Sequence, residues 1–191
     1  YKTYGPHLAL LYGKKELLDQ TKNLNHEFLA SEIPYTMNPG GPNHEELACL
    51  SGVTDYYETL YIHHFTEQGL NLHEKGKKVF ELIYNHEETL IKTLIEFLKL
   101  KKNVRLIGKT SHSRSERMPT VSFTVKDKSS LEIAKAAGKN QIGIRNGEFY
   151  AWRCLKGLGI EPNDGVVRVS MVHYNNIEEV NRLIDFLDTI L

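Results

Sequence analysis

The sequence predicts an α/β protein whose second half forms a small α+β domain. Two patterns predict this fold class: short apolar strands alternate with helical segments from residue 104 onward, and residues 72–100 carry apolar side chains at helical spacing. The composition agrees, since 40% of the 191 residues are hydrophobic and 25% are charged. We therefore expect three parts: residues 1–71, a long connecting helix at 72–100, and a small domain at 101–191.

The first part of the chain is expected to begin with a strand. The apolar run from His7 to Gly13 predicts a buried strand, and residues 14–25 predict a short helix that leads into a loop. The glycines and prolines of that loop cannot continue a helix: Pro34, Pro39, Gly40, Gly41 and Pro42. Asn43 then predicts the N-cap of a helix that runs to about His64.

The second half of the chain predicts a β-β-α-β-α-β-α order after the long helix. The expected elements are strands at 104–108 and 120–125, a helix at 129–137, a strand at 141–145, a helix near 150–154, a strand at 166–172 and a helix at 177–191. Ser129 or Ser130 is the expected cap of the first of these helices. This alternation favours a compact sheet with its helices on one face.

The charge balance excludes some classes of partner. Lysine plus arginine equal aspartate plus glutamate at 24 each, so no net field favours nucleic acid or an anionic membrane surface. No segment has the unbroken apolar length that spans a bilayer. Cys49 and Cys154 are far apart, which predicts two reduced thiols in a cytoplasmic protein rather than a disulfide framework.

The nine histidines do not predict a metal site. His63 and His64 are adjacent, and adjacent residues of a helix point about 100° apart. Neither these two nor His73 and His86 have a cysteine or carboxylate at ligand spacing that would close a site.

A lysine near the start of the chain is the first candidate for chemistry. Lys2 precedes a Gly5-Pro6 turn and the predicted strand, and a lysine held in this way is suited to keep an aldehyde cofactor as a Schiff base. The pattern K-x-x-G-P, followed by an apolar strand that ends in Tyr12-Gly13, resembles the pyridoxal-phosphate (PLP) lysine loop of class V aminotransferases and cysteine desulfurases. The resemblance implies that Lys2 is the Schiff-base lysine. An ordinary turn lysine is the alternative for so short a pattern.

Two arginines extend the resemblance. Arg168 lies in an apolar strand, where a guanidinium is unfavourable to bury unless it meets an anion. It matches the family arginine that pairs with the α-carboxylate of the substrate, which implies the same role here. Arg145 falls on the R-x-G pattern just ahead of the family's active-site loop and is the second expected substrate-binding residue. A snorkelling or salt-bridged structural arginine is the alternative for both.

The glycine-rich loop also has a counterpart in the family. Residues 39–43 stand where cysteine-desulfurase-like proteins carry a Gly-Thr-Pro-Asn loop that reaches across a dimer interface toward the cofactor phosphate. The resemblance implies a homodimer in which Gly40 and Gly41 bind this phosphate through backbone N–H groups. Gly41 replaces the family's threonine. The alternative is a Pro/Gly turn that only starts a helix.

The active-site loop departs from the desulfurase pattern. In the R-x-G-x-x-C form of that loop, Tyr150 stands where the nucleophilic cysteine would be. Cys154 is about one helical turn further on, and we expect it to be a packed core cysteine. Little or no desulfurase activity is therefore expected. Downstream, Asn176 and Glu179 predict a capping box in a segment similar to the family's Y-N-T-x-E-E.

Together, the order of these motifs implies the carboxyl-terminal portion of a PLP-dependent transferase or lyase that acts on an amino-acid substrate. It comprises the end of the large cofactor domain of a fold-type I enzyme, followed by the small α+β domain. Because the chain starts inside a motif without methionine, we expect a longer polypeptide, and the isolated chain is expected to bind PLP poorly. The alternative is a non-catalytic dimerisation or partner-binding domain. The substrate and the reaction type stay open.

Overall fold

The computed structural model describes residues 2–30, 32, 35–38 and 40–191. Pro34 and Pro39 of the predicted loop lie outside the described residues. The chain divides into two compact units, Tyr1–Val79 and Phe80–Leu191, and each is described by itself. The division falls within one long helix, α4, Leu72–Leu100, whose bounds equal those predicted.

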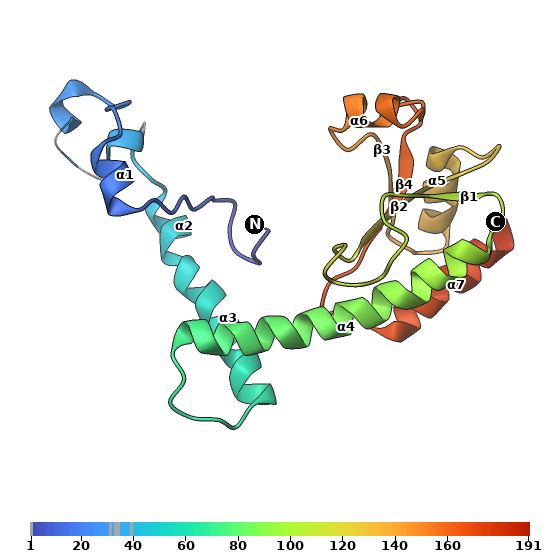
Figure 1. The fold of residues 1–191 in the computed structure, drawn as a ribbon, viewed down its shortest axis with the longest axis horizontal. Coiled ribbons are helices and arrows are strands. Elements are labelled where there is room, and N and C mark those ends of the chain that lie inside the picture. Colours follow the sequence, from blue (N-terminus) through green and yellow to red (C-terminus); the bar gives the residue numbers. More distant parts are fainter. Residues whose placement is uncertain (1, 31, 33–34, 39) are drawn as a thin grey trace. The chain divides into compact units, whose positions relative to one another are not determined.

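Helices, short 3-10 turns and irregular connecting segments make up the first unit (Figure 1). Its elements before α4 are α1 (Lys15–Asp19), η1 (Glu27–Leu29), η2 (Tyr35–Met37), α2 (His44–Ala48) and α3 (Leu50–His64). The side chain of Asn43 accepts a hydrogen bond of 3.0 Å from the backbone N–H of Glu46, which confirms the predicted N-cap. The predicted helix is divided at Cys49, which ends α2 and precedes α3.

The strand expected at residues 7–13 is not formed. These residues have no regular secondary structure, and the side chains of Leu10, Leu11 and Tyr12 are 72%, 79% and 86% exposed. The reason is that a strand requires a neighbouring strand for its N–H and C=O groups, and the described residues of this unit supply none.

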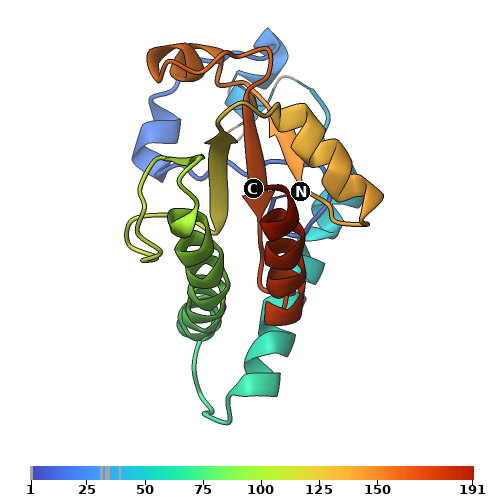
Figure 2. The same cartoon turned by 90° about the vertical axis from the view of Figure 1, so that its right-hand side faces the viewer.

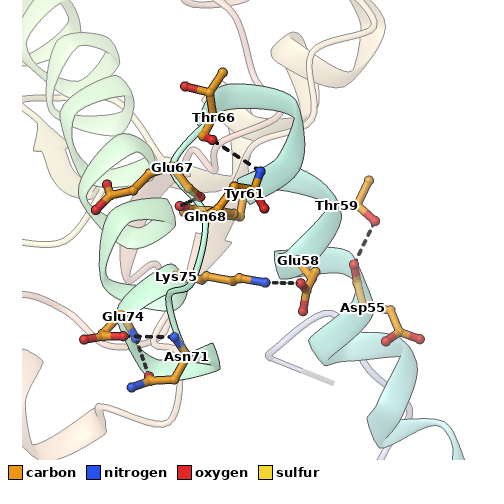
Figure 3. Close-up of polar contacts among 10 residues, drawn as sticks. All are labelled: Asp55, Glu58, Thr59, Tyr61, Thr66, Glu67, Gln68, Asn71, Glu74 and Lys75. Carbon is orange, nitrogen blue, oxygen red and sulfur yellow. Dashed lines mark hydrogen bonds and ion pairs between the residues drawn. The ribbon is translucent and has the colours of Figure 1, made fainter.

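Helix α3 and the start of α4 form a hairpin whose polar contacts are drawn in Figure 3. Tyr61 is 3% exposed, and its hydroxyl donates a 2.7 Å hydrogen bond to the carbonyl of Glu67 in the connection. Lys75 of α4 pairs with Glu58 of α3, and its ammonium lies 5.5 Å from the centroid of the Tyr61 ring. These contacts fix the connection between the two helices.

The start of α4 has a reciprocal cap. The side chain of Asn71 accepts from the backbone N–H of Glu74 at 3.0 Å, and the carboxylate of Glu74 accepts from the backbone N–H of Asn71 at 2.9 Å (Figure 3). Both bonds satisfy N–H groups that have no partner inside the helix.

The second unit contains a four-stranded antiparallel sheet in the order β1-β2-β4-β3. Its strands are β1 (Val104–Ile107), β2 (Thr120–Val125), β3 (Arg145–Gly147) and β4 (Val166–Ser170), and its helices besides α4 are α5 (Ser130–Lys139), α6 (Trp152–Gly157) and α7 (Ile177–Ile190). The mixed α/β character predicted from the sequence is confirmed. Strand β3 differs in position, because it begins at Arg145, where the predicted strand 141–145 was to end.

One sheet face carries the main core. Helices α4 and α7 lie side by side in both views, and α5 joins them in the same cluster (Figures 1 and 2). The inward side chains of β2 and β4 alternate along each strand, as expected for a half-buried sheet. The most buried members of this core are Leu94, Ile95, Val121, Phe123, Val167 and Leu187.

Helix α6 corrects the expectation that all helices lie on one face. Leu155 of α6 and Ile160 pack against Val166 of β4 in a second, smaller cluster. Because side chains alternate along a strand, Val166 faces away from the core that holds Val167. The α6 segment therefore covers part of the opposite sheet face.

Local capping in this unit follows the sequence. Ser129 caps α5 by accepting from the backbone N–H of Leu131. Asn176 and Glu179 form the predicted capping box at the start of α7, with hydrogen bonds of 2.9 Å and 3.0 Å.

Candidate functional site

The pairing of β3 with β4 brings the two predicted substrate-binding arginines together. Arg145 of β3 and Arg168 of β4 are direct partners in the antiparallel register. Ser122 of β2 is the partner of Arg168 on its other side. Residues directly opposite each other project from the same sheet face, with Cβ atoms about 4.5–5.5 Å apart. Ser122, Arg168 and Arg145 therefore form one row on the face away from the main core.

Two glycines allow β3 and β4 to meet where they do. Gly165 has a φ of +70°, and a Cβ added to it would lie 2.2 Å from the carbonyl carbon and oxygen of Gly147. No side chain fits at that distance, so glycine is required at this position. Gly147 is the last residue of β3, and Gly165 immediately precedes β4. Their close contact supports the register that pairs Arg145 with Arg168.

An aromatic ring positions the Arg168 guanidinium. The guanidinium carbon of Arg168 lies 3.7 Å from the centroid of the Phe149 ring, within the range of a cation–π contact. Phe149 and the next residue, Tyr150, both have left-handed backbones, with φ of +50° and +60°. Two consecutive aromatic residues in this region are unusual, and such conformations cluster at functional sites.

Neither arginine is neutralised by the protein around it. Among the residues that the structure describes, no carboxylate lies within ion-pair distance of Arg168 or Arg145. Arg168 is half-buried and Arg145 is exposed. Both guanidiniums therefore keep hydrogen-bond donors for an anion, and the substrate-binding role of the two arginines stays a prediction.

Lys2 belongs to the first unit and lies on an exposed turn. It lines a depression of about 360 Å³ together with Thr3, Gly5, Pro6, Leu8, Ala9, Leu10 and Leu50. The buried strand expected beside it is not formed, and Lys2 itself is exposed. A site that holds both Lys2 and Arg168 stays a prediction, because the two residues belong to different units.

Gly40 and Gly41 precede α2 in an exposed loop. A Cβ added to either glycine would meet no atom within 4 Å among the described residues. Contact of these glycines with a phosphate stays a prediction.

Cys154 is exposed, which corrects the expectation of a packed core cysteine. It lies on α6, whose buried contact is made by the neighbouring Leu155, so the helix turns Cys154 outward. Tyr150, at the position of the family's nucleophile, is fully exposed. Cys49 is likewise a free, exposed thiol.

The second unit contains a buried carboxyl group, that of Glu87, which was not predicted from the sequence. Glu87 of α4 is 7% exposed and accepts a hydrogen bond from the backbone N–H of His173. Burial raises the pKa of Glu87, while the nearby His86 and the His173 N–H act in the opposite direction. Burial and the charge of His86 lower the pKa of His173. The position of Glu87 between Ile83 and Leu90 on the apolar stripe was the signal that could have found it.

His86 and Glu87 of α4 contact His173 and Asn175 in the segment that follows β4. An imidazole nitrogen of His86 lies 2.7 Å from the carbonyl oxygen of Asn175. Glu87 also lines a cavity of about 360 Å³ together with Tyr84, Arg114 and Arg117.

The described part of the chain holds no group of three or more His, Cys, Asp or Glu side chains arranged to bind a metal ion. Over the same residues, none of the helices combines the length and apolar character needed to cross a membrane.

Comparison with known proteins identifies relatives over the whole chain. The "Aminotransferase-like protein FGM3" of Gibberella zeae is 37% identical over 192 residues, which cover 100% of this chain and 44% of the relative. The "Cysteine desulfurase-like protein ustD" of Aspergillus flavus is 30% identical over 200 residues, which cover 100% of this chain and 41% of the relative. The chain thus spans less than half the length of these two relatives.

Solved structures support the fold. The cysteine desulfurase of Thermococcus onnurineus superposes with a TM-score of 0.63 at 24% identity, over 82% of this chain and 33% of that one.

Residues 77–183, more than half of the chain, match the sequence model of the family described as "Aminotransferase class-V". This match contains the arginine pair and the aromatic loop beside it. The resemblance inferred from the motifs is confirmed, and the chain belongs to the aminotransferase class-V family.

Proposed function

We propose that this chain works as part of a PLP-dependent enzyme that acts on an amino-acid substrate. The observation that carries the proposal is the pair of in-register arginines, which have no carboxylate partner among the described residues. A guanidinium forks onto a carboxylate through two parallel hydrogen bonds, and every α-amino acid presents such a carboxylate. Family membership supports the same class of substrate.

The residues around Lys2 fit the requirements of an aldehyde cofactor. An exposed primary amine beside a depression lined by Leu8, Ala9 and Leu10 offers both a nucleophile for the aldehyde and apolar surface for a ring. When bound, PLP supplies an electron sink for the α-carbon of the substrate. Lys2 would hold the cofactor and move the proton at the α-carbon, and Arg168 would orient the α-carboxylate. The backbone N–H groups of Gly40 and Gly41 are proposed to contact the phosphate.

Loading the full-length protein with PLP and reducing it with borohydride tests this assignment. We expect a visible imine absorbance, and mass spectrometry of the reduced protein should find the pyridoxyl group on Lys2. The variant Lys2→Ala should lose both signals, whereas Lys22→Ala, which removes another exposed lysine, should keep them. A pyridoxyl group on a different lysine would refute the role of Lys2. Absence of the absorbance in the wild type would refute PLP binding altogether.

The remaining expectations belong to this proposal as well. The family resemblance supports a homodimer, and the two free thiols support a reducing, cytoplasmic location. Tyr150 in place of the nucleophilic cysteine argues against sulfur transfer from cysteine, although relatives carry desulfurase names. Family membership does not favour the alternative of a non-catalytic dimerisation or partner-binding domain.

A further inference from the structure

The sheet face away from the main core carries two neighbouring cations, Arg145 and Arg168, whereas one carboxylate requires only one. Arg145 and Arg168 stand directly opposite each other on neighbouring strands. Like charges in this arrangement destabilise a sheet. No anion among the described residues relieves the repulsion. A ligand that carries two negative groups would do so.

The two guanidiniums differ in their surroundings, which suits two different anionic groups. Phe149 covers one face of the Arg168 guanidinium at 3.7 Å, so its N–H edges are left for a planar, bidentate partner. Arg145 is exposed, and among the described residues no ring or carboxylate contacts its guanidinium. Ser122, beside Arg168 in the same row, adds a hydroxyl that is available to donate a hydrogen bond to the same ligand.

We infer that the amino-acid substrate is acidic, with a second carboxylate on its side chain. Arg168 binds the α-carboxylate, and Arg145 binds the side-chain carboxylate and so determines specificity. This inference rests on the proposed function. A single bidentate guanidinium already satisfies both oxygens of one carboxylate, so a neutral amino acid would leave Arg145 without a partner. In an aspartate or glutamate skeleton the two carboxylates lie a few ångströms apart, so two arginines on directly opposite residues can reach one carboxylate each.

Binding of small carboxylates to the 191-residue chain tests the site without any cofactor. The probes are succinate, with two carboxylates, propionate, with one, and inorganic phosphate, and the readout is the NMR shift of the arginine Nε–H signals. We expect succinate to shift the signals of both Arg145 and Arg168 and to bind about tenfold more tightly than propionate. Equal affinity for succinate and propionate would overturn the inference. Phosphate shifting both signals as strongly as succinate would overturn it too, because the site would then be a general anion site.

Substitutions assign the two carboxylates to the two arginines. In Arg145→Gln, the affinity for succinate should fall to about that for propionate, and the affinity for succinate should fall much more than that for propionate. Arg145→Lys should restore part of the preference, and Arg168→Gln should weaken both ligands. Arg182→Gln is the matched control, because Arg182 lies on α7 at the other sheet face and donates to the Asn140 carbonyl. Loss of propionate binding in Arg145→Gln would contradict the assignment.

The PLP-loaded full-length protein separates this inference from the proposed function. Aspartate and glutamate should change its visible spectrum at lower concentrations than asparagine and glutamine, and Arg145→Gln should remove the difference. If the neutral amides act as well as the acids, only the inference fails. If no amino acid changes the spectrum, the proposed function fails and the substrate assignment fails with it.

Discussion

Asp164 connects the loop before β4 to the start of α5. Its carboxylate accepts a 2.6 Å hydrogen bond from the Ser129 hydroxyl and bonds of 3.0 Å and 2.9 Å from the backbone N–H of Ser130. Burial by itself would raise the pKa of Asp164, but these hydrogen bonds outweigh it and hold the pKa below its ordinary value of 3.8. Folding therefore favours the ionised form of this carboxyl group.

Replacement of this carboxylate should destabilise the second unit in a pH-dependent way. Asp164→Ala is expected to lower the free energy of unfolding by about 1–3 kcal/mol at neutral pH, because it leaves the partly buried N–H of Ser130 without its acceptor. Since the folded pKa is depressed, the contribution is fully present above the ordinary value of 3.8 and is lost as the pH falls through the lower folded value.

Urea unfolding of the wild type and the variant at a series of pH values between neutral and strongly acidic measures this difference. Asp185→Ala, which removes an exposed carboxylate of α7, is the control and should change stability little at any pH. An equal effect of Asp164→Ala in acid and at neutral pH would show that its charge is not involved.

At the scale of elements, the junction between β3 and β4 decides the geometry of the candidate site. β3 has only three residues, so few hydrogen bonds hold it at the sheet edge. Its register against β4 depends on the approach of Gly147 to Gly165, where no Cβ fits. A small change at this junction therefore moves Arg145 relative to Arg168.

Gly165→Ala should separate the two strands. We expect a loss of about 1–3 kcal/mol in the free energy of unfolding, because the new Cβ must displace backbone rather than a flexible side chain. The NMR contacts between Arg145 and Arg168 should weaken in the same variant. Gly138→Ala in α5 is the matched control: its Cβ meets open space in a helix, so it should stabilise the protein by about 0.5–1 kcal/mol. A Gly165→Ala variant with wild-type stability and intact strand contacts would contradict this account.

At the scale of the whole molecule, the two units differ in how much apolar surface they bury. The second unit has a continuous core that includes Leu94 and Ile95, both with no exposed surface. In the first unit, Leu10, Leu11 and Tyr12 are exposed. Since apolar burial is the dominant stabilising contribution, local stability should be concentrated in the second unit.

Hydrogen exchange should report this difference. The amides of residues 90–98 in α4 should exchange only with opening free energies on the order of 5 kcal/mol or more, whereas those of residues 9–12 should exchange nearly freely. Leu94→Ala should lower the protection of residues 90–98 by about 2–5 kcal/mol through loss of core packing. Strong protection of residues 9–12 in the wild type would show that this segment is paired in solution.

Local interactions explain which elements were predictable. Asn43, Ser129 and Asn176 cap helices through residues two or three positions further along the chain, so the sequence contains both partners of each bond. The long amphipathic stripe of α4 was predictable for the same reason. The strand expected at 7–13 was not, because strand formation depends on a partner that a local pattern does not contain.

The candidate site shows the same division. Arg168 was recognisable as a candidate from the sequence, because a cation in an apolar strand is unusual, and its role stays a prediction. Its contact with Phe149 was not predictable, because the loop that carries the ring turns back through two left-handed residues. The exposure of Cys154 depends on which side of α6 meets the sheet, and this too is decided by packing.

The sequence by itself determined the family, through the order of its motifs, and the helix caps and the long helix, which depend on neighbours along the chain. Only the tertiary structure decided that Arg145 stands opposite Arg168, that Phe149 stacks on one of them, and that α6 covers the outer sheet face. The physical reason is that strand register and ring stacking arise from contacts between segments far apart in the chain, where close packing selects one arrangement.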